Sequence, residues 1–226
     1  RTAYDALRRP IETFLRSDAS SERLIGRTSY GENEPDPETR NQRGKHIRVL
    51  DQAGIVISDD YDFKGNLLTS IRQVAQNYKE TIDWNSDVAL DPVVYTTVSR
   101  FDALNRPTAI TTPDGSVYRP TFNEANLLVR VHVNLRGAAT ATAFVTGIDY
   151  DAKGQRTRIE YGNGVKTEYG YDPLTLRLRN LRTTRSTARL QDLHYTYDPS
   201  GNITHISDDA QQTLYFNNQV VTPAND

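Results

Sequence analysis

One short phrase recurs along this chain of 226 residues: an aromatic residue and an aspartate, a few residues that include a turn former, and the start of a strand. The interval from Phe101 to Phe122 is the same as the interval from Tyr150 to Tyr171. A fixed period predicts stacked supersecondary units that share one continuous core. Most of the conspicuous residues are therefore expected to be structural. The copies are Tyr4-Asp5, Tyr61-Asp62, Phe101-Asp102, Tyr150-Asp151, Tyr171-Asp172 and Tyr197-Asp198, with Phe122-Asn123 as a variant.

The unit that begins at Tyr150 shows what each copy is expected to form. The carboxylate of Asp151 can accept hydrogen bonds from backbone N–H groups two or three residues further on, which closes a turn. Gly154 can supply the positive φ at the end of that turn. Thr157, Ile159 and Tyr161 then alternate with charged residues, which is the pattern of a half-buried strand.

The sequence also predicts the register of the hairpin that follows. A two-residue loop at Asn163-Gly164 would place Tyr161 opposite Lys166, a core side chain against a charge. A slip of one residue moves every side chain to the other face of a sheet, so only one loop length fits the pattern. We predict a three-residue loop, 162–164, with Gly164 in the left-handed conformation. The predicted partners are Tyr161 and Val165, Ile159 and Thr167, Glu160 and Lys166, and Arg158 and Glu168.

Turn residues recur at fixed offsets from the lead aromatic of each copy. Gly115 follows Phe101 at the same offset at which Gly164 follows Tyr150. The fourth position is Gly or Asn in five of seven copies, and these types best tolerate the left-handed conformation. Each unit therefore predicts a β-hairpin and a return turn, and successive hairpins predict one all-β, curved, coiling antiparallel sheet. The fourth-position residues are Arg8, Gly65, Asn105, Asn126, Gly154, Thr175 and Gly201.

Other segments fit the repeat less closely. Alternating apolar residues predict a strand over 127–133, and prolines among charges predict a long exposed loop over 31–45. Residues 66–84 are expected to begin as strand and continue as a short helix, at most near 71–80, with loop over 85–92. No linker clearly divides the chain, so we expect a single domain over 1–226.

Composition limits the remaining classes of protein. Apolar residues make up only 36% of the chain, and the mean hydropathy is −0.66, which favours thin sheets with one wet face. The net charge of −2 does not suggest a nucleic-acid or membrane-surface partner. No apolar run is long enough for a transmembrane helix, and no signal peptide is apparent. Cysteine is absent, which removes disulfides and thiolate metal sites, and methionine is absent even at position 1. We expect an internal piece of a longer protein.

These repeats resemble the RHS or YD-repeat family, whose unit reads roughly Tyr-Asp-x-x-Gly-Arg-Leu. The resemblance covers essentially the whole chain. Three stretches are similar to the RHS region of insecticidal toxin complexes, in their B and C components and SpvB-like relatives. The best copies are 61–67 and 197–203, and the three stretches are 4–11, 154–165 and 190–205.

The resemblance implies a structural function. In that family the repeats form a hollow β-shell around a toxic C-terminal cargo, so the chain would be shell wall of a secreted or exported bacterial toxin. Its partners would be the remaining repeats, the cargo and other toxin-complex subunits. The family also has a core region whose aspartates cut the cargo free, and we find no such segment here. An isolated piece of wall has open edges, so we also expect edge-strand self-association or aggregation.

Alternative chemistry is weakly supported by the sequence. Lead tyrosines can stack on sugars, so a cell-surface or carbohydrate-binding repeat module is the alternative function. One aspartate per repeat does not supply the paired carboxylates of acid–base catalysis, and no nucleophile elbow or P-loop occurs. We therefore expect no enzyme, cofactor or metal. The weaker candidates are the acidic clusters 59–62 and 208–209 for calcium, the basic stretch 40–48 for an acidic partner, and His46, His132, His194 and His205 for zinc, of which His194 and His205 could meet across a hairpin.

Overall fold

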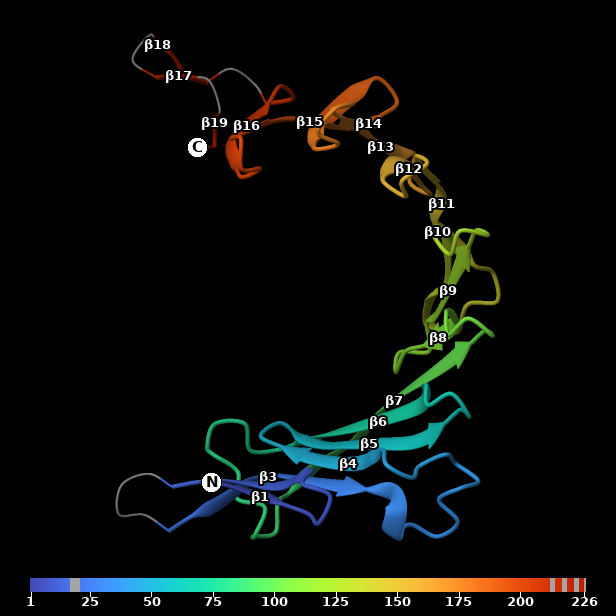
Figure 1. Ribbon diagram of the computed structural model, residues 1–226, viewed down its shortest axis with the longest axis vertical. Coiled ribbons are helices and arrows are strands. Elements are labelled where there is room, and N and C mark those ends of the chain that lie inside the picture. Colours follow the sequence, from blue (N-terminus) through green and yellow to red (C-terminus); the bar gives the residue numbers. More distant parts are fainter. Residues whose placement is uncertain (17–20, 212–213, 217–218, 222–223, 226) are drawn as a thin grey trace. The chain divides into compact units, whose positions relative to one another are not determined.

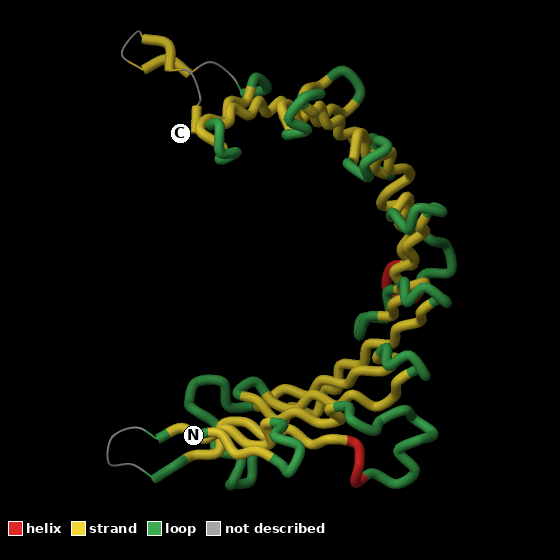
Figure 2. The backbone as a smooth tube through the Cα atoms, viewed as in Figure 1, coloured by secondary structure: helices red, strands yellow, loops and turns green. Residues whose placement is uncertain are grey.

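The computed structural model describes residues 1–16, 21–211, 214–216, 219–221 and 224–225. These residues form two compact units, Arg1–Tyr118 and Arg119–Asp226, which are described separately. Strands account for nearly all of the regular structure of the described residues, which otherwise contains the short 3-10 turns Gly31–Asn33 and Leu135–Gly137, drawn in red in Figure 2. The prediction of an all-β, antiparallel fold is confirmed. No helix in the described ranges is long and apolar enough to cross a membrane.

In the first unit, each strand pairs antiparallel with its neighbours in the sequence, as the succession of labels in Figure 1 shows. Strand β9 crosses the boundary between the units. The elements are β1 (Thr2–Tyr4), β2 (Pro10–Leu15), β3 (Arg23–Tyr30), the 3-10 turn Gly31–Asn33, β4 (His46–Asp51), β5 (Gly54–Tyr61), β6 (Leu67–Ala75), β7 (Leu90–Phe101), β8 (Pro107–Thr111) and β9 (Val117–Phe122).

The connection between β6 and β7 covers part of the sheet in the first unit. Strand β4 pairs with β3 only from Arg27 onwards, so the start of β3 needs another partner on that side. The connection supplies it: the N–H of Leu24 donates to the carboxylate of Asp83 at 2.9 Å, and the N–H of Trp84 donates to the Leu24 carbonyl at 2.8 Å. Leu24 is fully buried as a result. An irregular loop thus satisfies backbone groups where no strand is available.

The predicted helix near 71–80 is wrong. Strand β6 continues to Ala75, and its second half pairs with β7, with Arg72 opposite Tyr95 and Gln73 opposite Val94. Local spacing of apolar residues imitates a helix here, but pairing with a distant strand decides the outcome. The predicted loop over 85–92 is also too long, because β7 begins at Leu90.

The second unit continues the same succession of antiparallel strands (Figure 1). The predicted strand over 127–133 is observed as β10, one residue later at each end. The elements are β10 (Leu128–Asn134), the 3-10 turn Leu135–Gly137, β11 (Thr142–Tyr150), β12 (Arg156–Tyr161), β13 (Val165–Tyr171), β14 (Leu178–Arg185), β15 (Ala188–Tyr197), β16 (Ile203–Asp208), β17 (Leu214–Phe216), β18 (Gln219–Val221) and β19 (Ala224–Asn225).

The core of the second unit includes a row of side chains that runs across neighbouring strands. Ile148 lies opposite Ile159, which lies opposite Thr167, and all three are buried. The pairs Glu160 with Lys166 and Arg158 with Glu168 also form, so the predicted three-residue loop is confirmed. Its last residue has the left-handed conformation, with φ of 79° at position 164.

Candidate functional site

Each lead aromatic ends a strand, and the aspartate after it organises the turn to the next strand. In the turn at 62–66, one carboxylate oxygen of Asp62 accepts the backbone N–H groups of Lys64 and Asn66, each at 2.9 Å. The side-chain amide of Asn66 donates to the other oxygen at 2.8 Å. Because the acceptor is charged, these bonds are stronger than neutral ones. Corresponding backbone donors bond to Asp5 (Leu7, Arg9), Asp102 (Leu104, Arg106), Asp151 (Lys153, Gln155), Asp172 (Leu174, Thr175) and Asp198 (Gly201, Asn202).

The fourth position after the lead aromatic is left-handed in six of the seven copies. The exception is Thr175, where the prediction is wrong: its neighbour Leu176 has φ of 62° instead. The Asp172 N–H there bonds to the carbonyl of Arg177, five residues on, rather than four, so this turn is one residue longer. The left-handed residues and their φ angles are Arg8 (60°), Gly65 (86°), Asn105 (61°), Asn126 (65°), Gly154 (80°) and Gly201 (101°), and Gly115 in the hairpin turn at 112–116 has 78°.

The hydrogen bonds of the turns fix the charge state of their carboxylates. The side-chain amide of Asn66 lowers the pKa of Asp62, and that of Asn202 lowers the pKa of Asp198. The backbone N–H of Arg9 lowers the pKa of Asp5 in the same way. These groups are therefore ionised acceptors at neutral pH, and each is used by its own turn.

Four of the lead tyrosines connect their repeat to the one before it. The hydroxyl of Tyr150 donates to the carbonyl of Leu128, the first residue of the preceding strand, at 2.6 Å. Tyr197 donates to Leu178 in the same way at 2.7 Å. The bond therefore runs from the end of one strand to the start of its neighbour, where the chain leaves the previous turn. Two further copies are Tyr61 to His46 at 2.8 Å and Tyr171 to Arg156 at 2.9 Å.

In four of the repeats, the residue that leaves the turn (Arg9, Asn66, Gln155 or Arg177) makes a second connection, directed at the next turn. In the second unit, the amide of Gln155 donates to the carbonyl of Leu176 at 2.9 Å, and Arg177 donates to the carbonyl of Asp198 at 2.9 Å. In the first unit, the amide of Asn66 donates to the side chain of Asn105 at 2.9 Å. Neighbouring turns are thus tied side by side within each unit.

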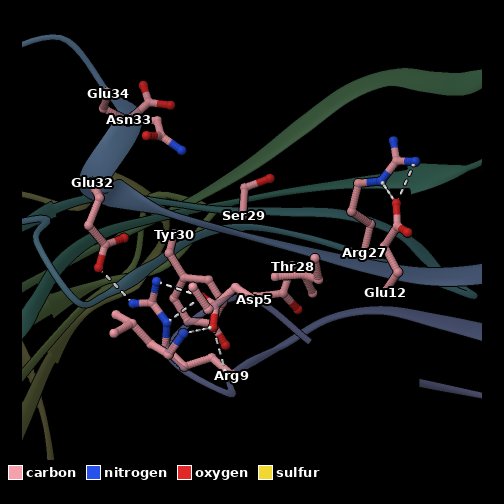
Figure 3. A pocket seen from close by; sticks show the side chains of 13 residues that line it. Asp5, Arg9, Glu12, Arg27, Thr28, Ser29, Tyr30, Glu32, Asn33 and Glu34 are labelled. Carbon is pink, nitrogen blue, oxygen red and sulfur yellow. Dashed lines mark hydrogen bonds and ion pairs between the residues drawn. The ribbon is translucent and has the colours of Figure 1, made fainter. Parts of the chain in front are cut away.

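Arg9, the residue that leaves the first turn, makes a connection of the same kind. It lines a pocket of about 650 Å³ in the first unit (Figure 3). Arg9 lies over the ring of Tyr30, 3.9 Å from its centre, and bonds to Asp5 at 2.7 Å and to Glu32 at 2.6 Å. Figure 3 shows this arginine between the two carboxylates. The guanidinium of Arg9 is paired with both carboxylates, Asp5 and Glu32. The pocket therefore lies at a junction between neighbouring turns.

Comparison with known proteins shows which proteins this chain is similar to. The chain is 32% identical to the Toxin subunit YenC2 of Yersinia entomophaga over 96% of its length. It superposes on the crystal structure of TcdB2-TccC3 with a TM-score of 0.82 and 31% identity over 96% of its length. The Photorhabdus luminescens Tc holotoxin pore with the mutation TccC3-D651A gives a TM-score of 0.81 at 31% identity over the same share. The chain is a homologue of Tc toxin subunits. No protein-family model matches it.

This Tc toxin homologue corresponds to only part of its relatives. It spans 24% of the YenC2 subunit, 11% of the TcdB2-TccC3 chain and 10% of the chain in the holotoxin pore structure. The resemblance to insecticidal toxin complexes that the repeats predict is confirmed, and so is the all-β fold.

Two structural residues of this Tc toxin homologue escaped the sequence patterns. Tyr30 ends β3 and donates to the carbonyl of Pro10, the first residue of β2, at 3.2 Å, as a lead tyrosine does in the other repeats. Glycine follows it instead of aspartate, so the two-residue pattern misses it. The signal available was its position within the long interval between Tyr4 and Tyr61, which leaves room for a further repeat.

The second is Asp192 on β15, whose side chain is only 1% exposed. It accepts bonds from the amide of Asn180 at 2.9 Å and from Arg182 at 3.1 Å, and it pairs with Arg189 at 3.2 Å. Burial by itself raises the pKa of Asp192, but Asn180 and the two guanidinium groups outweigh burial and lower it. No repeat pattern marks this position, because its partners come together only across paired strands.

Several of the other candidate groups have structural partners. In the basic stretch 40–48, Arg40 pairs with Asp59 at 2.9 Å, and the Lys45 ammonium lies 5.7 Å from the centre of the Tyr61 ring. His194 lies 3.5 Å from Asp192 and 3.3 Å from Asp209. His194 lies opposite Ser207 and His205 lies opposite Thr196, so the two histidines are diagonal neighbours on β15 and β16 and not a directly opposed pair. Within the described part of the chain, no group of three or more His, Asp or Glu residues is arranged to hold a metal.

Proposed function

We propose that this chain is a wall segment of an RHS-type β-shell that encloses a toxic C-terminal cargo in a secreted bacterial toxin complex, without catalysis of its own. The observation that carries the proposal is the similarity to TcdB2-TccC3 over 96% of the chain. In this proposal the whole chain acts as a single structural domain. Its partners are the remaining repeats and the cargo of the parent protein, and other toxin-complex subunits. No nucleic acid or membrane span is involved.

The repeat geometry suits a wall. A wall must resist opening between neighbouring repeats, and strand pairing alone leaves the turns free to separate. The bonds from tyrosine hydroxyls and turn-exit side chains hold successive turns together, independently of the strand ladders. We assign this role to the recurrent aromatic, Asp and Gly residues: a local turn from each aspartate and glycine, and a tie to the previous repeat from Tyr61, Tyr150, Tyr171 and Tyr197.

The same geometry argues against the alternative function, a carbohydrate-binding module. A sugar platform needs exposed rings with free faces. Tyr61 is only 5% exposed, and Tyr150, Tyr171 and Tyr197 are partly buried with their hydroxyls bonded to backbone carbonyls. Tyr4 is the exception among the lead tyrosines, at 60% exposed.

Protease protection tests the proposal. In the full-length subunit that carries this segment, we expect the C-terminal cargo to resist a broad-specificity protease as long as the wall is folded. The triple variant Tyr150→Phe, Tyr171→Phe, Tyr197→Phe should expose the cargo at a lower temperature, whereas Tyr78→Phe, at an 82% exposed position, should not. Digestion of the cargo at the rate of the isolated cargo, with the wall still intact, would refute enclosure. A sugar-array screen covers the alternative.

A further inference from the structure

One asparagine of the chain is followed by glycine, and this pair lies in a hairpin loop. Asn163 and Gly164 are the last two residues of the three-residue loop between β12 and β13, and both are exposed. The main-chain nitrogen of a glycine can approach the side-chain carbonyl carbon of the preceding asparagine, because glycine has no side chain to block it. The space around Gly164 is also open, since a Cβ at this position would have no neighbour within 4 Å. The loop therefore contains both partners of a ring-forming reaction.

Two hydrogen bonds act on the reacting groups in opposite directions. The N–H of Val165 donates to the side-chain oxygen of Asn163 at 3.1 Å, which folds that side chain back along its own backbone as in an Asx turn. Negative charge develops on this oxygen when the carbonyl carbon is attacked, and a donor already aimed at it lowers the barrier. The N–H of Gly164, in contrast, donates to the carbonyl of Tyr161 at 3.0 Å and must leave this bond before the nitrogen reacts. Because Gly164 is exposed, water can take the place of either partner.

The corresponding loop of the first unit has the same geometry, with an aspartate in place of the asparagine. Its glycine, Gly115, has φ of 78°, against 79° for Gly164. The N–H of Gly115 donates to the carbonyl of Thr112 at 2.9 Å. The carboxylate of Asp114 accepts the N–H of Ser116 at 3.0 Å. The repeat therefore accepts a carboxylate at the position that the asparagine holds in the second unit.

We propose that Asn163 is a site of spontaneous deamidation. The nitrogen of Gly164 forms a bond to the side-chain carbonyl carbon of Asn163, the bond from that carbon to the amide nitrogen breaks, and the proton of Gly164 leaves with the ammonia through solvent. The product is a five-membered succinimide ring. Water then adds to one of the two ring carbonyl carbons, and the C–N bond at that carbon breaks to give aspartate or isoaspartate. Nothing is oxidised or reduced, and water is the co-reactant.

The two products differ in their effect on the hairpin. Aspartate leaves the main chain as it was, and the loop around Asp114 holds a carboxylate in the matching place. Isoaspartate adds one carbon atom to the main chain of the loop, whose length sets the pairing of Glu160 with Lys166. Isoaspartate is therefore the product that disturbs the pairing of β12 with β13. The proposal does not depend on the shell function.

Peptide mapping of the full-length subunit that carries this segment tests the proposal. After incubation in mildly alkaline buffer, trypsin releases Asn163 in the peptide 159–166 and Asn85 in the peptide 80–100. Asn85 is the matched comparison, because it is also exposed and the N–H of the next residue, Ser86, also donates to a carbonyl, that of Asp83 at 3.1 Å. A sample digested before the incubation corrects for conversion during the digestion itself.

We expect Asn163 to lose its amide about tenfold faster or more than Asn85, because glycine leaves the approach open and the bond from Val165 stabilises the developing charge. Mass spectrometry of the two peptides measures both rates in the same digest. Equal rates would overturn the proposal. So would an asparagine at 163 that stays intact in the folded subunit and reacts only after unfolding in urea, because the loop would then protect it.

Two variants identify the ring as the route. Asn163→Gln keeps an amide, but its longer side chain would have to close a larger ring, so we expect the variant peptide to stay unmodified during the same incubation. Asn163→Asp supplies the aspartate product and shows where its peptide elutes. The incubated subunit should give this peak and a second peak of equal mass, the isoaspartate. Loss of the amide from Asn163→Gln at the same rate, or an aspartate peak alone, would show direct hydrolysis without a ring and would contradict the proposal.

Discussion

The tyrosine ties make a quantitative prediction for Tyr150→Phe. The substitution removes one hydroxyl, which donates to the carbonyl of Leu128 at 2.6 Å in a partly buried place, and it leaves the packing of the ring in place. One such bond contributes roughly 0.5–1.5 kcal/mol net, and an acceptor left without a partner adds to the loss, so we expect about 1 kcal/mol less free energy of unfolding. For a chain of this size the loss corresponds to a fall in Tm of about 2–4 °C.

The repeat allows the same change to be made three times. Tyr150, Tyr171 and Tyr197 bond to carbonyls on different strands, and each hydroxyl serves its own tie. Contributions that share no partners add, so the triple Phe variant should lose about 3 kcal/mol. Tyr78→Phe is the matched control, because Tyr78 is 82% exposed and its change removes no such tie.

Urea unfolding followed by circular dichroism measures these losses. The midpoints should fall in the order control, single variant, triple variant, with an unchanged dependence on urea, because the surface exposed on unfolding stays the same. If the triple variant unfolds like the Tyr78→Phe control, the hydroxyl bonds do not stabilise the repeats, and the lead tyrosines act through ring packing alone.

Three further predictions concern backbone conformation and pH. Gly162→Ala should lower the free energy of unfolding by about 3 kcal/mol or more, because the new Cβ would overlap a neighbouring backbone carbonyl. Gly164→Ala should lower it by only about 1 kcal/mol, because the φ of 79° is strained for alanine but the space around it is open. Equal losses of stability in thermal unfolding would contradict this. Leu176→Gly should raise stability by up to about 1 kcal/mol by relieving a left-handed leucine, while Leu174→Gly should not. The pKa of Asp192 is lowered in the folded chain, so its ionised form stabilises the fold at any pH above the unfolded pKa of about 3.9. This stabilisation is lost as the pH falls through the lower, folded pKa. Asp192→Asn should therefore flatten the acid limb of a plot of stability against pH.

Features that depend on one hairpin could be predicted from the sequence. The charges at Arg158, Glu160, Lys166 and Glu168 select one register, because a slip by one residue would bury them, and the structure has that register. The positions of turns follow from Gly and Asn for the same local reason. One extra residue in a turn is harder to see, so the left-handed position was assigned to Thr175 when Leu176 occupies it.

Features that depend on distant pairing could not be predicted in this way. The segment after Leu67 has apolar spacing that fits a helix as well as a strand, and only its partner β7 decides between them. Asp192 is an ordinary charged residue in the sequence, and it becomes buried because Asn180 and Arg182 lie on the paired strand β14. Tyr30 acts as a lead tyrosine because its hydroxyl bonds to a carbonyl of the neighbouring strand β2. A pattern based on the residues next to Tyr30 in the sequence does not contain this partner.

The aspartate and the aromatic of the repeat therefore have separable roles. The aspartate bonds to backbone within its own turn, so it fixes one turn whatever the neighbouring repeats contain. The tyrosine hydroxyl bonds to another strand, so it contributes only where a neighbouring repeat is in place. Two lead aromatics, Phe101 and Phe122, have no hydroxyl to donate, and the boundary between the compact units, at Tyr118, falls between them in the sequence. These two phenylalanines lack the oxygen atom with which Tyr61, Tyr150, Tyr171 and Tyr197 make this tie, while the aspartate or asparagine that follows keeps the turn in every copy.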